Sequence, residues 1–277
     1  MSVINGGQSY AVIDSHVHTF PAKVAQAAVS KLERTSGITP FTDGTLPDTE
    51  AKIKAAGVDH AVLLNIATAP KQQASINRCA RDVNQSTHGF FTALGSVHFL
   101  AEDALEELNR IHEAGIPGIK LHPDYQNFMI DDERVFPIYQ RCSDLGLIVY
   151  FHAGWDCYSP DLVHAPPEAS RRVLDTFPKL KVVLAHFGGL RQWERVEKSL
   201  IGRNVWLDTA MCATFGEPEQ MERLFNMHNP DRILLGSDCP WENPMISVNF
   251  ILKMGLSPEI KKKILSENAR RLFGITD

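Results

Sequence analysis

Short apolar runs alternate with segments of helical periodicity along the whole chain, and this alternation limits the possible folds more than any other feature. A predicted strand recurs about every 30 residues, and a helix-period segment follows each one. The predicted strands are residues 11–15, 60–66, 91–97, 118–121, 147–151, 181–185, 205–207 and 232–236. Strands that alternate with helices form βαβ units and a parallel sheet. Eight such units favour an α/β fold of the closed (β/α)8 TIM-barrel type over an open doubly wound sheet.

The first strand is followed by a helix and then by a long loop rich in Thr, Gly and Pro, residues 35–47. Loops of this length are often lids or binding loops. No shift in composition marks a linker, so we expect a single domain over residues 1–277. Residues 1–9 are expected to form a flexible N-terminal segment.

The charge and the cysteine content indicate which binding partners and which cellular compartment to expect. The net charge is −5 and no run of Lys or Arg is present, which argues against nucleic acid and anionic membranes as partners. No apolar stretch reaches the roughly 18 residues that span a bilayer, and the first residues lack the pattern of a signal peptide. The five scattered cysteines are typical of reduced thiols in a cytoplasmic protein. We therefore expect a small-molecule substrate, and a homo-oligomer remains open.

Polar side chains collect at the predicted carboxyl ends of the strands, where TIM barrels build their active sites. The first strand leads into a His-x-His motif, His16-Val-His18, which in isolation would be weak support for a metal site. Six of the eleven histidines, however, fall at predicted strand ends. Imidazoles with a carboxylate suit Zn²⁺, Mn²⁺ or Fe²⁺, and the lack of clustered thiolates argues against a structural zinc site. Three His and one Asp leave a coordination position open for a water, whose pKa the metal lowers. These strand-end residues are His16, His18, His98, Lys120, His122, His152, His186, Asp208 and Asp238.

In their order along the chain, these residues resemble the amidohydrolase superfamily, most closely its amidohydrolase-2 branch of metal-dependent TIM-barrel hydrolases and decarboxylases. The likeness runs from Asp14-Ser-His-Val-His18 to Gly236-Ser-Asp-Cys-Pro240. It implies that His16, His18, His152 and Asp238 bind the metal and that Asp238 also deprotonates the water. It further implies that His186 either polarises the water or substrate, or binds a second ion.

The chemical state of Lys120 distinguishes a metal centre with one ion from a metal centre with two. The resemblance places it where two-metal members carry a carboxylated lysine, and its setting, Lys-Leu-His-Pro, is similar to that of dihydroorotases. Unmodified, Lys120 would be a cation for a substrate carboxylate. We favour one ion, preferably Zn²⁺, while two ions, Mn²⁺ and Fe²⁺ remain open. TatD-type nucleases share the His-x-His but carry a glutamate on strand four, which disfavours a nuclease.

Aromatic residues follow several strands and indicate a pocket for a planar or cyclic compound, although they would serve equally as packing at the barrel rim. The substrate-binding candidates are His122, Tyr125, Trp155 and Trp241, and Arg191 is a further candidate for an anionic group. His98 and His122 would bind substrate or brace the metal ligands.

Two reactions fit these residues. The leading hypothesis is metal-dependent hydrolysis of a small, carboxylated cyclic amide, lactone or ester, in which Asp238 and His186 move protons. The alternative is non-oxidative decarboxylation or hydration of an unsaturated or aromatic acid at the same metal site. A scaffold protein without catalysis would be expected to have lost metal ligands, yet all are present.

Overall fold

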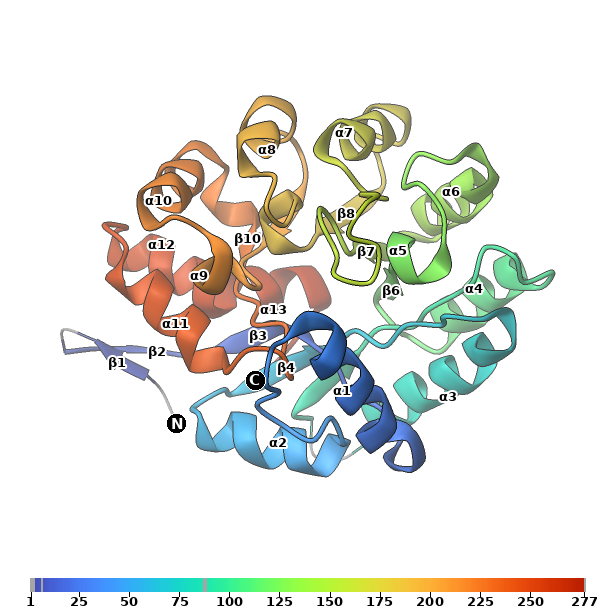
Figure 1. Cartoon of the computed structure of the whole chain (residues 1–277), viewed down its shortest axis with the longest axis horizontal. Coiled ribbons are helices and arrows are strands. Elements are labelled where there is room, and N and C mark those ends of the chain that lie inside the picture. The colour runs from blue at the N-terminus through green and yellow to red at the C-terminus, as the bar shows by residue number, and fades with distance from the viewer. Residues whose placement is uncertain (1–2, 6, 87–88, 277) are drawn as a thin grey trace. The chain divides into compact units, whose positions relative to one another are not determined.

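The computed structural model describes residues 3–5, 7–86 and 89–276. Contacts divide the chain into two compact units, Met1–Leu63 with Asp208–Asp277, and Leu64–Leu207. The strand–helix alternation predicted from the sequence is present in both units (Figure 1). Each unit is described in turn.

The first unit contains the strand that carries the His-x-His. Its strands are β1 (Val3–Asn5), β2 (Gln8–Tyr10), β3 (Ile13–Val17), β4 (His60–Leu63) and β10 (Ile233–Leu234). β1 and β2 pair in antiparallel orientation, and β3 pairs with β4 in parallel. The chain beyond β10 runs beside β3, where the Ser15 amide donates to the Leu235 carbonyl at 2.8 Å. This pairing brings the end of β3 next to the segment that carries Asp238.

The first unit also contains helices. They are α1 (Ala22–Ser36), α2 (Leu46–Ala55), α9 (Cys212–Phe215), α10 (Pro218–Met227), α11 (Pro244–Lys253), α12 (Pro258–Lys262) and α13 (Asn268–Phe273), with a 3-10 turn η4 (Pro230–Arg232) and a π-helical turn η5 (Lys263–Glu267). Gly37 ends α1 in the left-handed region at φ 72°, which glycine adopts without a steric cost. Thr45 caps α2 through its side-chain oxygen, which accepts from the Asp48 amide.

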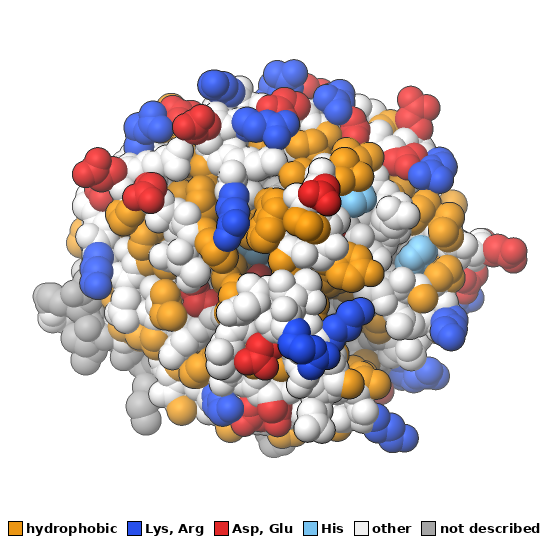
Figure 2. Space-filling view, in the orientation of Figure 1, with side chains coloured by type: hydrophobic (Ala, Val, Ile, Leu, Met, Phe, Trp, Pro, Cys, Tyr) orange, Lys and Arg blue, Asp and Glu red, His pale blue; other side chains and the backbone are white. Residues whose placement is uncertain are grey.

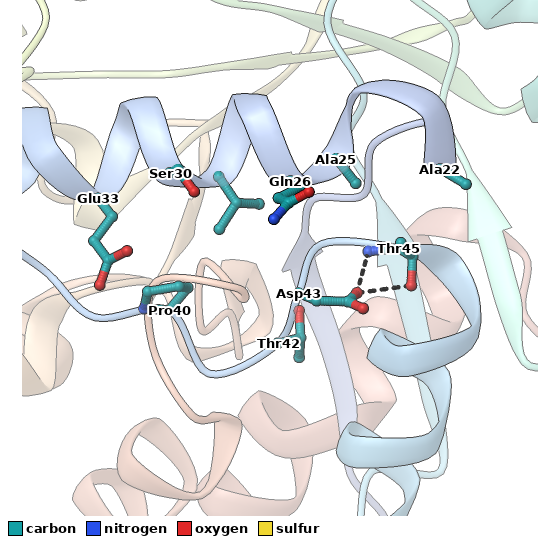
Figure 3. A pocket seen from close by; sticks show the side chains of 10 residues that line it. Ala22, Ala25, Gln26, Ser30, Glu33, Pro40, Thr42, Asp43 and Thr45 are labelled. Carbon is teal, nitrogen blue, oxygen red and sulfur yellow. Dashed lines mark hydrogen bonds between the residues drawn. The ribbon is translucent and has the colours of Figure 1, made fainter.

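The loop between α1 and α2 and the facing side of α1 line an open pocket of about 510 Å³ (Figure 3). Asp43 shapes the loop, because its Oδ1 accepts from both the amide and the hydroxyl of Thr45 at 2.7 Å. The pocket has a mixed polar and apolar lining, made by Ala22, Ala25, Gln26, Val29, Ser30, Glu33, Pro40, Thr42, Asp43 and Thr45.

The strands of the second unit are β5 (Phe91–Ala93), β6 (Gly118–Leu121), β7 (Ile148–Phe151), β8 (Lys181–Leu184) and β9 (Trp206–Asp208). All of them except β5 belong to one parallel sheet. β6, β7, β8 and β9 pair in this order, and Lys120 lies opposite Tyr150. Gly118 is needed in β6, because a Cβ there would lie 2.3 Å from the Ile148 carbonyl oxygen. In-register parallel strands place the residues that follow them at one edge of the sheet.

Helices connect the strands of the second unit. They are α3 (Gln73–Asn84), α4 (Ala104–Glu113), α5 (Pro123–Gln126), α6 (Phe136–Leu145), α7 (Pro167–Thr176) and α8 (Trp193–Ser199), with 3-10 turns η1 (Pro70–Gln72), η2 (Glu133–Val135) and η3 (His186–Gly188). α7 packs against α8, and α6 packs against β7 and α4 (Figure 1). Strand–helix–strand units with parallel strands are the α/β arrangement predicted from the sequence.

Several boundaries differ from the predicted ones. β3 begins and ends two residues later than predicted, because Val17 and its neighbours pair with the segment after β10. The short helices α5 and α9 were not predicted, and the π-helical turn η5 separates α12 from α13. All five cysteines are free thiols. Among the residues described, no helix combines the length and the hydrophobicity needed to cross a bilayer.

Candidate functional site

Three donor atoms of the first unit converge at the end of β3. The Nε2 atoms of His16 and His18 lie 3.0 Å apart. Oδ1 of Asp238 lies 3.2 Å from the first and 3.1 Å from the second. Donor atoms that surround one divalent ion at about 2.1 Å lie roughly 3–3.5 Å from one another. The triangle therefore has the chemistry and the spacing of part of a metal centre.

A second carboxylate fixes the orientation of the His16 ring. Nδ1 of His16 lies 2.7 Å from Oδ2 of Asp208, and both side chains are buried. A carboxylate accepts the Nδ1 proton, which leaves the Nε2 lone pair of a neutral imidazole facing Asp238. Two acceptors 3.2 Å apart are stabilised by a positive charge between them, which a bound cation or a shared proton would supply. The sequence places Asp208 at a strand end but does not reveal this role.

Asp238 stands in a sharp turn that the backbone of β3 holds in place. Its φ angle is 70°, in the left-handed region that Asp and Asn enter more readily than most residues. The Asp238 amide donates to the His16 carbonyl at 2.9 Å, and the His18 amide donates to the Cys239 carbonyl at 2.7 Å. The Trp241 amide donates to the Asp238 carbonyl at 2.9 Å and closes the turn. The turn therefore presents the carboxylate toward the two histidines.

In the second unit, His152 and His186 meet at the ends of β7 and β8. Nδ1 of His152 lies 3.1 Å from Nε2 of His186, and both rings are buried. His186 opens the turn η3 at φ 56°, and its carbonyl accepts from the Trp193 indole at 3.1 Å. The two histidines predicted to share the site are therefore neighbours, with ring nitrogens able to share a proton.

Lys120 is fully buried in β6, and its Nζ lies 4.9 Å from the centre of the Tyr150 ring on β7. An ammonium is attracted to the face of an aromatic ring, whereas a negatively charged carbamate is repelled by it. This is the contact that an unmodified Lys120 makes.

A cluster around His122 was only partly predicted. The His122 ring stacks on His152 with centroids 4.2 Å apart and on Tyr125 at 3.8 Å. Oδ2 of Asp156 lies 3.6 Å from Nε2 of both histidines, which is beyond hydrogen-bond distance. His122, His152 and Asp156 have the donor set of a metal site. The two rings, however, are parallel within 9°, so their lone pairs do not converge on one ion.

Asp124, in α5, lies next to this cluster and was not predicted as a site residue. Its Oδ1 lies 3.0 Å from Nδ1 of His164, and it also accepts from the Ser159 hydroxyl. Burial raises the pKa of Asp124, although these hydrogen bonds oppose the shift. The spacing His122-Pro-Asp124 and the position of Asp156, four residues after His152, were the only signals in the sequence.

The remaining predicted residues lie in separate surroundings. The Arg191 guanidinium lies over the Trp155 ring at 4.4 Å, and the Trp155 amide donates to the Leu190 carbonyl at 3.0 Å. His98 stacks on Phe99 at 5.5 Å, and burial lowers its pKa. Tyr125 and Trp155 thus belong to the second unit with His122, and Trp241 belongs to the first unit with Asp238.

A model of the family described as Amidohydrolase (amidohydrolase-2) matches residues 13–275. A 2-amino-3-carboxymuconate-6-semialdehyde decarboxylase of Dictyostelium discoideum is 25% identical over 225 residues, 67% of this chain and 61% of that protein. A dihydroorotase of Helicobacter pylori (strain HPAG1) is 31% identical over 115 residues, 39% of this chain and 34% of that protein. The chain therefore spans less than two thirds of the length of either relative.

Solved structures resemble the chain over nearly its whole length. An uncharacterised TIM-barrel protein from Bordetella bronchiseptica has a TM-score of 0.75 and 22% identity, covering 95% of this chain and 98% of that one. A 5-carboxyvanillate decarboxylase from Novosphingobium aromaticivorans, complexed with manganese and 4-hydroxy-3-methoxy-5-nitrobenzoic acid, has a TM-score of 0.72 and 18% identity, covering 98% and 97%. These likenesses confirm the predicted TIM-barrel fold class.

Proposed function

The chain belongs to the amidohydrolase family and is an enzyme, and from this premise we propose that it is a metal-dependent decarboxylase of an aromatic or unsaturated carboxylic acid. The geometric observation that carries the metal dependence is the triangle of His16, His18 and Asp238, with edges of 3.0–3.2 Å. The decarboxylase relative, which aligns with 67% of the chain, favours this reaction over hydrolysis.

By family membership we propose that His152 joins His16, His18 and Asp238 as a metal ligand. We propose one ion, with Lys120 as an unmodified ammonium whose Nζ lies 4.9 Å from the centre of the Tyr150 ring. The donor set of imidazoles and a carboxylate suits Zn²⁺ or Mn²⁺. Such an ion would supply Lewis acidity, orienting and polarising the substrate.

The residues of the chain then have to move one proton. In decarboxylation the bond between the substrate carbon and its carboxylate breaks, CO₂ leaves, and the carbon takes up a proton. His186 Nε2, which lies 3.1 Å from His152 Nδ1, is one candidate for the proton donor, and the Asp238 carboxyl is the other. Tyr125, Trp155, Trp241 and His122 are proposed to contact the substrate.

Hydrolysis of a carboxylated cyclic amide, lactone or ester is the second candidate. Lys120 favours it, since this residue is buried at the strand-four position and lies in a Lys-Leu-His-Pro segment similar to that of dihydroorotases. The 115-residue likeness to a dihydroorotase agrees with that observation. In this reaction Asp238 and His186 would move the protons of the attacking water and of the leaving group.

We propose a small molecule as the partner and the cytoplasm as the compartment. Basic and acidic side chains are interspersed on the face drawn in Figure 2, unlike the continuous basic surface that binds nucleic acid. Five free cysteines suit a reducing compartment.

One experiment separates the two reactions. The purified protein, loaded with Zn²⁺ or Mn²⁺, is incubated with a panel of hydroxybenzoic acids, unsaturated dicarboxylic acids, lactones and cyclic amides. Release of CO₂ from an acid, with no ring opening of lactones or amides, supports the decarboxylase. Ring opening without CO₂ overturns it in favour of the hydrolase.

A further inference from the structure

The carboxylate of Asp14 is buried between the two chain segments that carry His16 and Asp238. Its Oδ1 accepts from the backbone amide of His16 at 3.1 Å and from that of Ser237 at 3.0 Å. Its Oδ2 accepts from the Ser237 hydroxyl at 2.5 Å. The Asp14 side chain is fully inaccessible to solvent. One carboxylate therefore joins β3 to a residue 223 positions later in the chain.

These hydrogen bonds lie directly beside the donor atoms of the candidate metal centre. Ser237 precedes Asp238, and the Ser237 hydroxyl also accepts from the Cys239 amide at 3.0 Å. Ser237 is thus hydrogen-bonded directly to Asp14, and Cys239 is linked to Asp14 through the Ser237 hydroxyl. Because Asp14 also holds the His16 amide, a single side chain constrains both ends of the His16–Asp238 pair.

A purely structural role explains this arrangement poorly. Burying a carboxylate costs several kcal/mol unless charge-assisted hydrogen bonds compensate. An apolar side chain at position 14 would avoid that cost but would leave the buried amides of His16 and Ser237 without this acceptor. The arrangement is explained if the carboxylate fixes the relative positions of the two segments more precisely than apolar packing could.

We propose that Asp14 is a positioning residue for the metal centre, which holds His16 and Asp238 at the spacing that binds the ion. The inference rests on the proposed metal dependence. It assigns no contact with metal or substrate to Asp14, whose oxygens are occupied by His16 and Ser237.

The test measures metal affinity, which does not require a known substrate. Zn²⁺ is titrated into the metal-free wild type and the variants in competition with a chromogenic chelator, and folding is checked by circular dichroism. Asp14→Ala is expected to weaken Zn²⁺ binding about 10–100-fold, the usual effect of removing a partner of metal ligands. Asp14→Asn is expected to restore most of the affinity, because the amide oxygen can still accept both backbone amides and the amide nitrogen can donate to Ser237.

Asp59→Ala is the matched control. The Asp59 carboxylate accepts from the Val12 amide at 2.9 Å, so it also holds the segment that leads into β3, but four residues from His16. A structural effect alone would lower the melting temperature of both alanine variants and leave their Zn²⁺ affinity unchanged. If Asp14→Ala does not fold, Ser237→Ala takes its place, with a several-fold loss of affinity expected.

The outcomes separate the two proposals. Wild-type affinity in a folded Asp14→Ala or Ser237→Ala variant overturns the positioning role and leaves the metal centre standing. Absence of Zn²⁺ and Mn²⁺ binding by the wild type overturns the metal centre, and the positioning role with it.

Discussion

The imidazole of His16 and the carboxylate of Asp208 form a buried pair, with Nδ1 and Oδ2 2.7 Å apart. The Asp208 carboxylate also accepts from the Ala210 amide at 2.9 Å through its other oxygen, so it cannot rotate freely. The pair fixes the tautomer of His16 and aims its Nε2 lone pair at the position shared with His18 and Asp238.

Asp208→Asn is predicted to weaken Zn²⁺ binding about 10–100-fold. The asparagine amide can donate to Nδ1 of His16, which moves the ring proton to Nε2 and blocks its lone pair. Competition with a chromogenic chelator measures the affinity. Asp175→Asn, which removes an exposed partner of Arg203, should bind Zn²⁺ as the wild type does. Equal affinity in both variants would show that Asp208 does not orient His16.

His186→Asn is predicted to lower kcat about 10²–10⁴-fold, the range for loss of a general acid or base. The variant should retain one equivalent of metal, because the proposed ligands are His16, His18, His152 and Asp238. Steady-state kinetics on the substrate found in the panel, with elemental analysis, measures both quantities. His112→Asn, at an exposed position on α4, is the control. Undiminished turnover in His186→Asn would remove this residue from the mechanism.

Lys120→Met is predicted to leave the metal content at one equivalent. Methionine fills nearly the same space in β6 and removes the buried charge beside Tyr150. Intact-mass measurement of the wild type in bicarbonate buffer should show no added CO₂. Two equivalents of metal in the wild type and one in the variant would instead establish a bridging carbamate on Lys120.

A surface ion pair of the second unit predicts a pH dependence of stability. Arg195 donates to both oxygens of Glu168, at 3.0 and 2.6 Å, and holds the pKa of this carboxyl below its usual value. A pKa that is lower in the folded state contributes stability above the unfolded value of about 4.5, and this contribution is lost as the pH falls through the folded value.

Glu168→Gln should therefore lower the free energy of unfolding at pH 7 by about 0.2–1 kcal/mol, since the pair is largely exposed. Urea denaturation at several pH values should show the two proteins converging in acid. A double-mutant cycle with Arg195→Gln isolates the pair energy. A difference that grows as the pH falls would contradict the assignment.

The strand-end histidines show what could be predicted from the sequence. A period of two along β3 brings His16 and His18 to one place, and the order of strands brings His152 beside His186. Both relationships depend on backbone periodicity and on parallel pairing, which the apolar pattern reveals. The convergence of Asp238 on His16 follows from the same pairing beyond β10.

The supporting carboxylates could not be predicted in this way. Asp14 and Asp208 act through side-chain contacts with residues 223 and 192 positions away. Asp124 lies in the one-turn helix α5, and Asp156 lies in an irregular segment after β7. A buried carboxylate has no periodic signature, because its role depends on which donors the tertiary structure brings to it. Helix α5 could not be predicted either, because it is one turn long, too short for a periodic pattern, and is capped by the His122 side chain.

Gly154 is predicted to be essential for the arrangement of His152 and His186. It lies at φ 90°, and a Cβ there would lie 2.0 Å from the Leu190 amide nitrogen, where the segments after β7 and β8 pair. Gly154→Ala must therefore separate the two segments, and we expect a loss of at least about 3 kcal/mol in the free energy of unfolding, well above a typical substitution. Activity should fall with it, because each segment begins at one of the two histidines.

Gly146→Ala is the matched control for this prediction. Gly146 lies at φ 68°, where alanine is also strained, but a Cβ there meets no atom within 4 Å. Its cost should be limited to about 1–2 kcal/mol of backbone strain, with activity unchanged. Urea denaturation of the two variants then separates the strain common to both from the clash that only Gly154→Ala creates. Equal losses in the two variants would mean that the paired segments adapt without moving His152 and His186.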